Sequence, residues 1–185
     1  IAHAAYYIEN NGEAAIFDPL REVQPYIDRA KKDNAVIKYV FETHFHADFV
    51  SGHLDLKAKT GAEIVFGPTA KPNYEATVAT DGQFFELGNY KIKVLHTPGH
   101  TMESTTYLLI DENGKEHGII SGDTLFIGDV GRPDLAQHVI ADLTQDKLAR
   151  HLFHSLREKI MPLSDDLIVY PNHGAGSACG KNMSK

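Results

Sequence analysis

Two histidines and an aspartate alternate along one short segment of the chain, THFHADF at residues 43–49. In an extended segment, side chains two positions apart point to the same side, so His44, His46 and Asp48 would converge. Two imidazoles and a carboxylate that converge from one loop make a good site for a first-row transition metal. Three exposed polar residues in a loop would be the alternative, but the alternating spacing favours a metal site.

Three further motifs carry histidine or aspartate later in the chain. In TPGHT (residues 97–101), Pro98 and Gly99 predict a tight turn that would direct His100 into a cleft. Asp123 lies in SGDTLF and His173 lies in PNHG. Each motif alone is weak. All four follow strand-like runs, and loops after strand ends are where rigid scaffolds place chemistry, so together they indicate a functional site.

The elements that must position these residues alternate between strands and helices. Apolar runs, alternating patterns and a hairpin turn at DENGK (111–115) predict strands at 14–18, 36–41, 63–66, 84–87, 91–96, 105–110, 118–121 and 167–170. Helical spacing of apolar residues predicts helices at 23–33, 50–60 and 142–157. Parallel and antiparallel signals are mixed, which favours two packed sheets with outer helices over a simple doubly wound sheet.

Composition sets limits on the kind of protein. The length of 185 residues fits one domain, 1–185, and the start at Ile1 rather than methionine leaves room for a longer native chain. A net charge of -7 argues against nucleic acid and anionic membranes as partners. No apolar run approaches the ~18 residues of a spanning helix. The single cysteine, Cys179, excludes an internal disulfide and fits a cytoplasmic location.

The four motifs in this order resemble the signature set of the metallo-β-lactamase superfamily over nearly the whole chain. The resemblance implies an α/β (α+β) fold of the αββα type, with two mixed β-sheets flanked by helices. It also implies a metal site at one edge, between the sheets. Family members with the full motif set build two adjacent metal sites there.

Carried over residue by residue, the resemblance implies a first site from His44, His46 and His100, a second from Asp48, residue 49 and His173, and Asp123 between them. Position 49, usually a histidine, is Phe49 in this chain, and phenylalanine cannot ligate a metal. We therefore expect a mononuclear site. The remaining residues of the second site would then orient ligands or a bound water.

Two more segments, GDVGRPDL (128–135) and HGAGSACGK (173–181), resemble the persulfide dioxygenase branch, the group related to the ethylmalonic encephalopathy protein. The match is closest to bacterial members in which this domain precedes a rhodanese domain, and those members also tend to carry HFHADF. This resemblance implies one Fe(II) per chain on His44, His100 and Asp123, with His46 either a further ligand or a residue that lines the site. Zinc is the alternative metal, because imidazole suits both ions.

The implied reaction converts a low-molecular-weight persulfide, such as glutathione persulfide, with O₂ and water into thiol and sulfite. Candidate substrate-binding residues are Arg132, Tyr170, Cys179 and Lys181. The guanidinium of Arg132 matches a carboxylate or persulfide anion, although it could equally tie down its glycine-rich loop. Cys179 could relay sulfane sulfur or simply be small. A rhodanese domain or protein, and a second copy of this chain, are further candidate partners.

Two other functions stay open from the sequence. A thioester hydrolase resembling glyoxalase II would use a metal-bound hydroxide, but that class usually needs the complete two-metal set. A non-catalytic domain that binds sulfur carriers is the second alternative. The histidines without a motif are interpreted as surface or structural residues: His3, His117, His138, His151 and His154.

Overall fold

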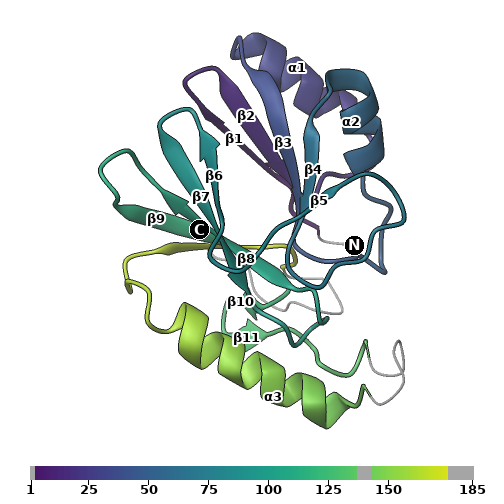
Figure 1. The fold of residues 1–185 in the computed structure, drawn as a ribbon, viewed down its shortest axis with the longest axis vertical. Coiled ribbons are helices and arrows are strands. Elements are labelled where there is room, and N and C mark those ends of the chain that lie inside the picture. Colours follow the sequence, from purple (N-terminus) through teal and green to yellow (C-terminus); the bar gives the residue numbers. More distant parts are fainter. Residues whose placement is uncertain (1–2, 137–142, 175–185) are drawn as a thin grey trace.

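The computed structural model describes residues 3–136 and 143–174, and its first half forms a mixed five-stranded sheet with two helices (Figure 1). In chain order these elements are β1 (Tyr6–Asn10), β2 (Glu13–Phe17), α1 (Gln24–Lys32), β3 (Val36–Glu42), α2 (His53–Thr60), β4 (Glu63–Phe66) and β5 (Thr77–Val78). The hairpin β1–β2 is antiparallel, whereas β2, β3, β4 and β5 are parallel neighbours. The parallel strands therefore end at the same edge.

The second half forms another five-stranded sheet. Its strands in chain order are β6 (Phe84–Leu87), β7 (Tyr90–His96), β8 (Thr105–Ile110), β9 (Glu116–Gly122) and β12 (Ile168–Pro171). Strands β6 to β9 form an antiparallel meander, and β12 lies parallel to β9. Between β9 and β12 come the short strands β10 (Leu125–Phe126) and β11 (Asp129–Val130), then α3 (Gln145–Ser155), which continues as a π-helical turn, Leu156–Ile160.

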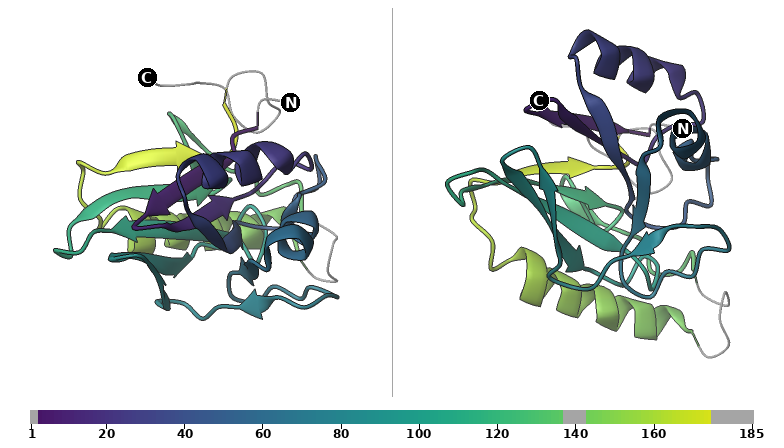
Figure 2. Two further views of the ribbon diagram at one scale, coloured as in Figure 1. Left: turned by 90° about the horizontal axis from the view of Figure 1, so that it is seen from above. Right: turned by 45° about the horizontal axis from the view of Figure 1, so that its top comes forward.

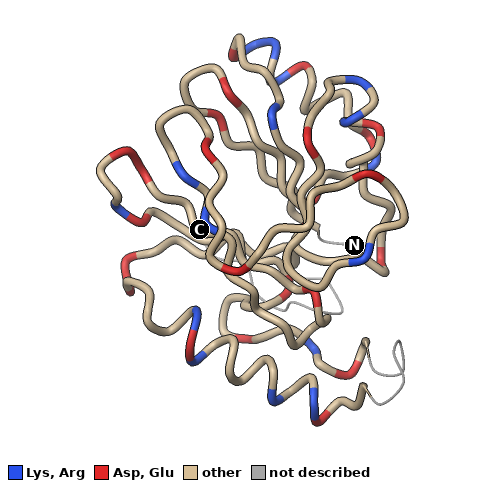
Figure 3. Tube along the Cα trace, in the orientation of Figure 1, with Lys and Arg blue, Asp and Glu red and all other residues tan. Residues whose placement is uncertain are grey.

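The two sheets pack against each other, with α1 and α2 outside the first sheet and α3 outside the second (Figures 1 and 2). This arrangement confirms the predicted αββα sandwich with two mixed sheets. No helix in residues 3–136 and 143–174 is long and apolar enough to cross a membrane. Basic and acidic residues are interspersed along the helices and hairpin tips (Figure 3).

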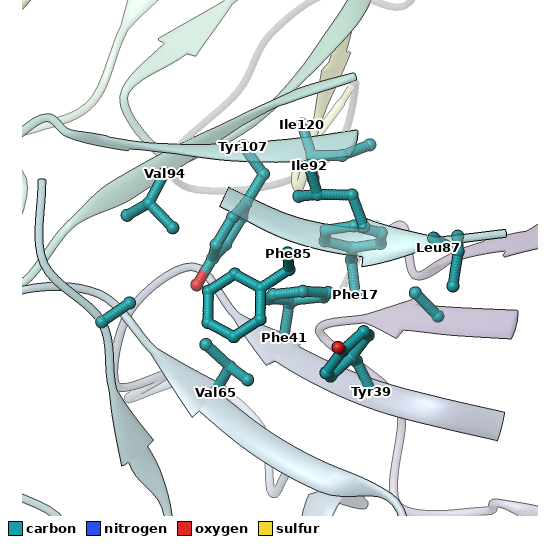
Figure 4. Packing of buried hydrophobic residues seen from close by; sticks show 12 residues of the cluster. Phe17, Tyr39, Phe41, Val65, Phe85, Leu87, Ile92, Val94, Tyr107 and Ile120 are labelled. Atoms are coloured by element: carbon teal, nitrogen blue, oxygen red, sulfur yellow. The ribbon is translucent and has the colours of Figure 1, made fainter. Parts of the chain in front are cut away.

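The core between the sheets is largely aromatic (Figure 4). The rings of Phe17 and Phe41 stack with their centroids 5.0 Å apart, and Tyr107 from the opposite sheet packs 4.8 Å from Phe41. Because strand side chains alternate between faces, the neighbours Ile16 and Val40 point the other way and pack under the helices. The core thus fixes the ends of β2 and β3 against the second sheet.

Every predicted strand overlaps an observed strand, and the differences have local causes. Helix α2 begins at His53 rather than at residue 50, because Ser51 pairs with Leu20 in a β-bridge. Strand β1 was not predicted. Its signal was Asn11-Gly12, whose φ angles of 51° and 79° suit the hairpin turn that joins β1 to β2.

Candidate metal centre

Three of the predicted ligands converge at one end of the sandwich. One donor atom from each of His44, His100 and Asp123 lies within 4.8 Å of the other two, and all three residues are buried. The imidazole rings lie 5.0 Å apart at 89°, and Nε2 of His100 is 3.5 Å from Oδ2 of Asp123. His44 follows β3 of the first sheet, whereas His100 and Asp123 follow β7 and β9 of the second. The site therefore joins the two sheets.

The two histidines are oriented through their Nδ1 atoms. Nδ1 of His100 donates to the carbonyl oxygen of Arg132 at 3.0 Å, so Nε2 keeps its lone pair for a metal. Nδ1 of His44 lies 2.9 Å from the hydroxyl oxygen of Thr43, which also accepts a hydrogen bond from Asn172. Each imidazole thus has one nitrogen held by the protein and one available for the site.

The glycine-rich GDVGRPDL segment lies directly on these ligands. A Cβ at Gly131 would be 1.8 Å from the carbonyl oxygen of Asp123 and 3.0 Å from Cβ of His100. Any side chain at position 131 would clash with Asp123, so glycine allows the segment to approach the ligands this closely. The predicted turn before His100 is similarly close-packed, since a Cβ at Gly99 would be 2.3 Å from the side chain of Leu152 on α3.

Asp48 and His173 lie beside the three donors and bind each other. Nε2 of His173 is 2.9 Å from Oδ2 of Asp48, and its Nδ1 is 2.8 Å from Oδ1 of Asp123. Burial alone would lower the pKa of His173, but the two carboxylates raise it above its usual value. The arrangement holds Oδ1 of Asp123 and leaves Oδ2 facing His100, which fits the orienting role predicted for His173.

Aromatic rings occupy the position where the family's second metal site would need a histidine. The Phe49 ring lies 4.4 Å from that of His46 and 4.0 Å from that of His3. His3 was expected to be a surface or structural residue. It lies beside the site, because it pairs with His173 in a β-bridge and its Nε2 donates to the carbonyl oxygen of Asp18, contacts that suit a structural role. Burial lowers the pKa of His3.

His46 belongs to a different group of side chains from the three converging donors. Its Nε2 lies 2.8 Å from Oδ1 of Asp18 and 3.5 Å from Oε2 of Glu42, and all three side chains are buried. Burial alone would lower the pKa of His46, but the carboxylates of Asp18 and Glu42 raise it to about 9. Sequence reasoning missed both acids, although each stands at the end of an apolar strand.

The predicted substrate-binding residues are placed less directly. The side chain of Arg132 pairs with Asp134, with Nη2 2.6 Å from Oδ2, while its carbonyl oxygen contacts His100. Tyr170 packs against the core between the sheets and against Tyr6. Two further candidates, Cys179 and Lys181, lie outside the described residues. The substrate role of all four stays a prediction.

The residues present fit a divalent transition metal. Two imidazole nitrogens and one carboxylate oxygen converge in a buried site, and each ligand is held through its other polar atom. This donor set suits Fe(II) and Zn(II) alike. The geometry therefore supports a metal centre without selecting the metal.

Comparison with known protein families and curated proteins agrees with this geometry. Residues 1–173 match the sequence profile of the metallo-beta-lactamase superfamily. A hydroxyacylglutathione hydrolase from Rhizobium etli is 34% identical over 169 residues, which cover 89% of this chain and 58% of that protein. The hydroxyacylglutathione hydrolase GloC from Haemophilus influenzae is 28% identical, covering 94% of this chain and 85% of that protein. The chain thus spans little more than half the length of the Rhizobium relative.

Solved structures share the fold. A metallo-beta-lactamase from Staphylococcus aureus superposes with a TM-score of 0.80 at 34% identity, covering 95% of this chain and 57% of that chain. ETHE1 from Myxococcus xanthus superposes with a TM-score of 0.79 at 26% identity, covering 96% of this chain and 73% of that chain. The proteins that are similar in sequence and those that are similar in structure therefore share one fold but have different names.

Proposed function

The chain belongs to the metallo-beta-lactamase superfamily, and from this premise we propose that it is a mononuclear Fe(II) persulfide dioxygenase. Its substrate would be a low-molecular-weight persulfide such as glutathione persulfide, oxidised with O₂ and water to thiol and sulfite. His44, His100 and Asp123 would hold the iron. The observation that carries the proposal is the closed second metal position around Phe49.

A two-metal hydrolase of this family would need Asp48, residue 49 and His173 as ligands of a second ion. In this chain Asp48 and His173 are joined by a hydrogen bond of 2.9 Å. Phenylalanine at position 49 packs against His3 and His46 and offers no donor atom. One ion on two histidines and a carboxylate leaves coordination positions open, as non-haem Fe(II) oxygenases require.

Similarity to known proteins supports the same branch of the family. The sequence resembles persulfide dioxygenases in GDVGRPDL and HGAGSACGK, and ETHE1 from Myxococcus xanthus shares the fold over 96% of this chain. The first of these segments touches the site itself, since Gly131 lies against Asp123 and the carbonyl of Arg132 binds His100. The resemblance thus includes residues that hold the ligands in place.

The iron would supply the redox chemistry with O₂, and the protein would supply position and burial. Thr43 and the Arg132 carbonyl fix the imidazoles of His44 and His100, so their free nitrogens face one point. His173 holds Oδ1 of Asp123 and keeps the carboxylate from turning. The guanidinium of Arg132 is exposed beside Asp134, and it would bind an anionic group of the substrate.

A glutathione thioester hydrolase is the second candidate, and a specific observation favours it. The curated relatives from Rhizobium etli and Haemophilus influenzae are both named hydroxyacylglutathione hydrolases. A non-catalytic domain for sulfur carriers is the third, and the complete three-donor site argues against it. A rhodanese partner, a homodimer and a cytoplasmic location remain predictions.

A paired assay tests the proposal. The protein is loaded anaerobically with Fe(II), or separately with Zn(II), and given glutathione persulfide or S-lactoylglutathione. We expect O₂ uptake with matching sulfite release in the iron form only. His100→Ala should lose this activity, whereas His117→Ala, an exposed position that pairs with Asp111 at the opposite end of β9 from Asp123, should keep it. Thioester cleavage by the zinc form without O₂ uptake by the iron form would establish the hydrolase instead.

A further inference from the structure

Glu42 is a buried carboxylate that the metal triad does not need. It is the last residue of β3 and is 1% exposed. Its Oε1 accepts a hydrogen bond from the hydroxyl of Ser51 and lies 3.3 Å from Nδ1 of His53. Its Oε2 lies 3.5 Å from Nε2 of His46. Burying a carboxylate costs free energy even when it has partners, so we ask what these contacts of Glu42 do.

The partners of Glu42 come from the middle and the far end of the loop that carries the first motif. His46 lies within that loop, and Ser51 lies at its far end, where it also pairs with Leu20 in a β-bridge. The backbone of Glu42 is fixed as well, since its carbonyl accepts a hydrogen bond from Tyr107 in the opposite sheet. Glu42 therefore has a fixed backbone, and its side chain holds the loop in place.

The geometry of His46 shows what this contact does. Its Nε2 faces Asp18 on one side and Glu42 on the other, while its Nδ1 is buried without a hydrogen-bond partner among the residues that the structure describes. The ring lies only 4.2 Å from that of His44, yet the nitrogens of His46 group with the carboxylates of Asp18 and Glu42, a second set of potential metal donors, and not with the first three. Anchored to Asp18 alone, the imidazole could pivot about Nε2. The second carboxylate removes that freedom.

We propose that Glu42 is a positioning residue that turns His46 away from the metal and keeps the number of protein ligands at three. The consequence is one more coordination position for molecules other than protein. This inference rests on a metal in the His44, His100 and Asp123 site, which the proposed function shares, but not on which reaction the metal performs.

The test uses Co(II), whose visible absorption intensity rises as coordination number falls and changes when a nitrogen ligand is added. In Glu42→Leu we expect the Co(II) spectrum to change and the Co(II) dissociation constant to fall about tenfold. In Glu42→Leu/His46→Ala the spectrum should return to that of the unmodified protein. Glu86→Leu is the matched control, because Glu86 is an exposed carboxylate on β6. It should change neither the Co(II) spectrum nor the Co(II) dissociation constant.

Two results would overturn the inference. One is a folded Glu42→Leu protein with an unchanged Co(II) spectrum and affinity. The other is a changed spectrum that persists in the double variant, because the new ligand would then not be His46. If Glu42→Leu does not fold, Glu42→Gln replaces it, because glutamine keeps the shape and weakens only the charged contact. Its Co(II) spectrum is then compared with that of Glu42→Gln/His46→Ala, with the same two outcomes. No O₂ or persulfide is involved, so this result is separate from the test of the dioxygenase.

Discussion

At the scale of single residues, each candidate ligand has one polar atom held by the protein, which leaves its other polar atom for a metal. His100 is held by a backbone carbonyl, His44 by a hydroxyl and Asp123 by an imidazole. Partners of this kind fix the direction of a ligand before the ion arrives. The specificity of such a metal site would therefore depend on residues outside the ligand set.

Gly131→Ala tests this dependence on the surrounding residues. The new methyl group would overlap the carbonyl oxygen of Asp123, which is 1.8 Å from the ideal Cβ position. We expect metal affinity to fall by about 10- to 100-fold, as when an outer partner is lost. Metal affinity is measured by competition with a chromophoric chelator.

Gly114→Ala is the control for Gly131→Ala. Gly114 lies in the β8–β9 hairpin, and a Cβ placed there would have no described atom within 4 Å. Its φ of 80° would strain any other residue. Gly114→Ala should lower the free energy of unfolding by about 1–2 kcal/mol and leave metal affinity unchanged. Equal loss of metal in both variants would mean that general destabilisation, rather than contact with the ligands, weakens the site.

At the scale of elements, the aromatic core holds the strand ends that carry the ligands. Phe41 is fully buried one residue before the end of β3, against Phe17 and Tyr107. Phe84, on β6, is 50% exposed. The two phenylalanines thus differ in burial but not in residue type. Replacing each with alanine therefore compares the loss of a core ring with the loss of a surface ring.

Phe41→Ala should lower the free energy of unfolding by about 3–5 kcal/mol, because it removes buried apolar surface and leaves a cavity. Phe84→Ala should lower it by about 1 kcal/mol or less, since little buried surface is lost. Both values come from denaturant unfolding of the metal-free proteins. Similar losses in the two variants would contradict the assignment of the core to the space between the sheets.

Local patterns in the sequence predicted most strands and helices, because those patterns depend on residues close together in the chain. The convergence of His44, His100 and Asp123, which lie far apart in the chain, was implied by the family resemblance. Neither local patterns nor the resemblance predicted the other contacts around the site. His3 reaches the site only because the first residues pair with His173, 170 positions away. Asp18 and Glu42 look like ordinary strand ends until the fold brings them to His46. Spacing alone also left the role of His46 open.

At the scale of the whole molecule, the candidate metal site joins the two sheets. His44 belongs to the first sheet, and the other two ligands follow strands of the second. Protein contacts cross at the same place: Thr105 donates its backbone N–H to the carbonyl of Thr43. An ion held by both sheets binds the folded state only, so it should stabilise the fold by mass action.

Removing the metal with a chelator should therefore lower the melting temperature, and restoring it should raise the temperature again. At a free metal concentration about 1,000 times the dissociation constant, the stabilisation is about 4 kcal/mol. Calorimetry with and without metal measures it. His100→Ala should show almost no shift between the two conditions, and a full shift in that variant would show that the ion binds elsewhere.

The most direct test of one metal ion on His44, His100 and Asp123 is an anaerobic Fe(II) titration of the metal-free protein. Binding is followed by calorimetry and by metal analysis after desalting. We expect one ion per chain in the unmodified protein and loss of that ion in both His100→Ala and Asp123→Asn. Two ions per chain, or one tightly bound ion that survives in both variants, would contradict it.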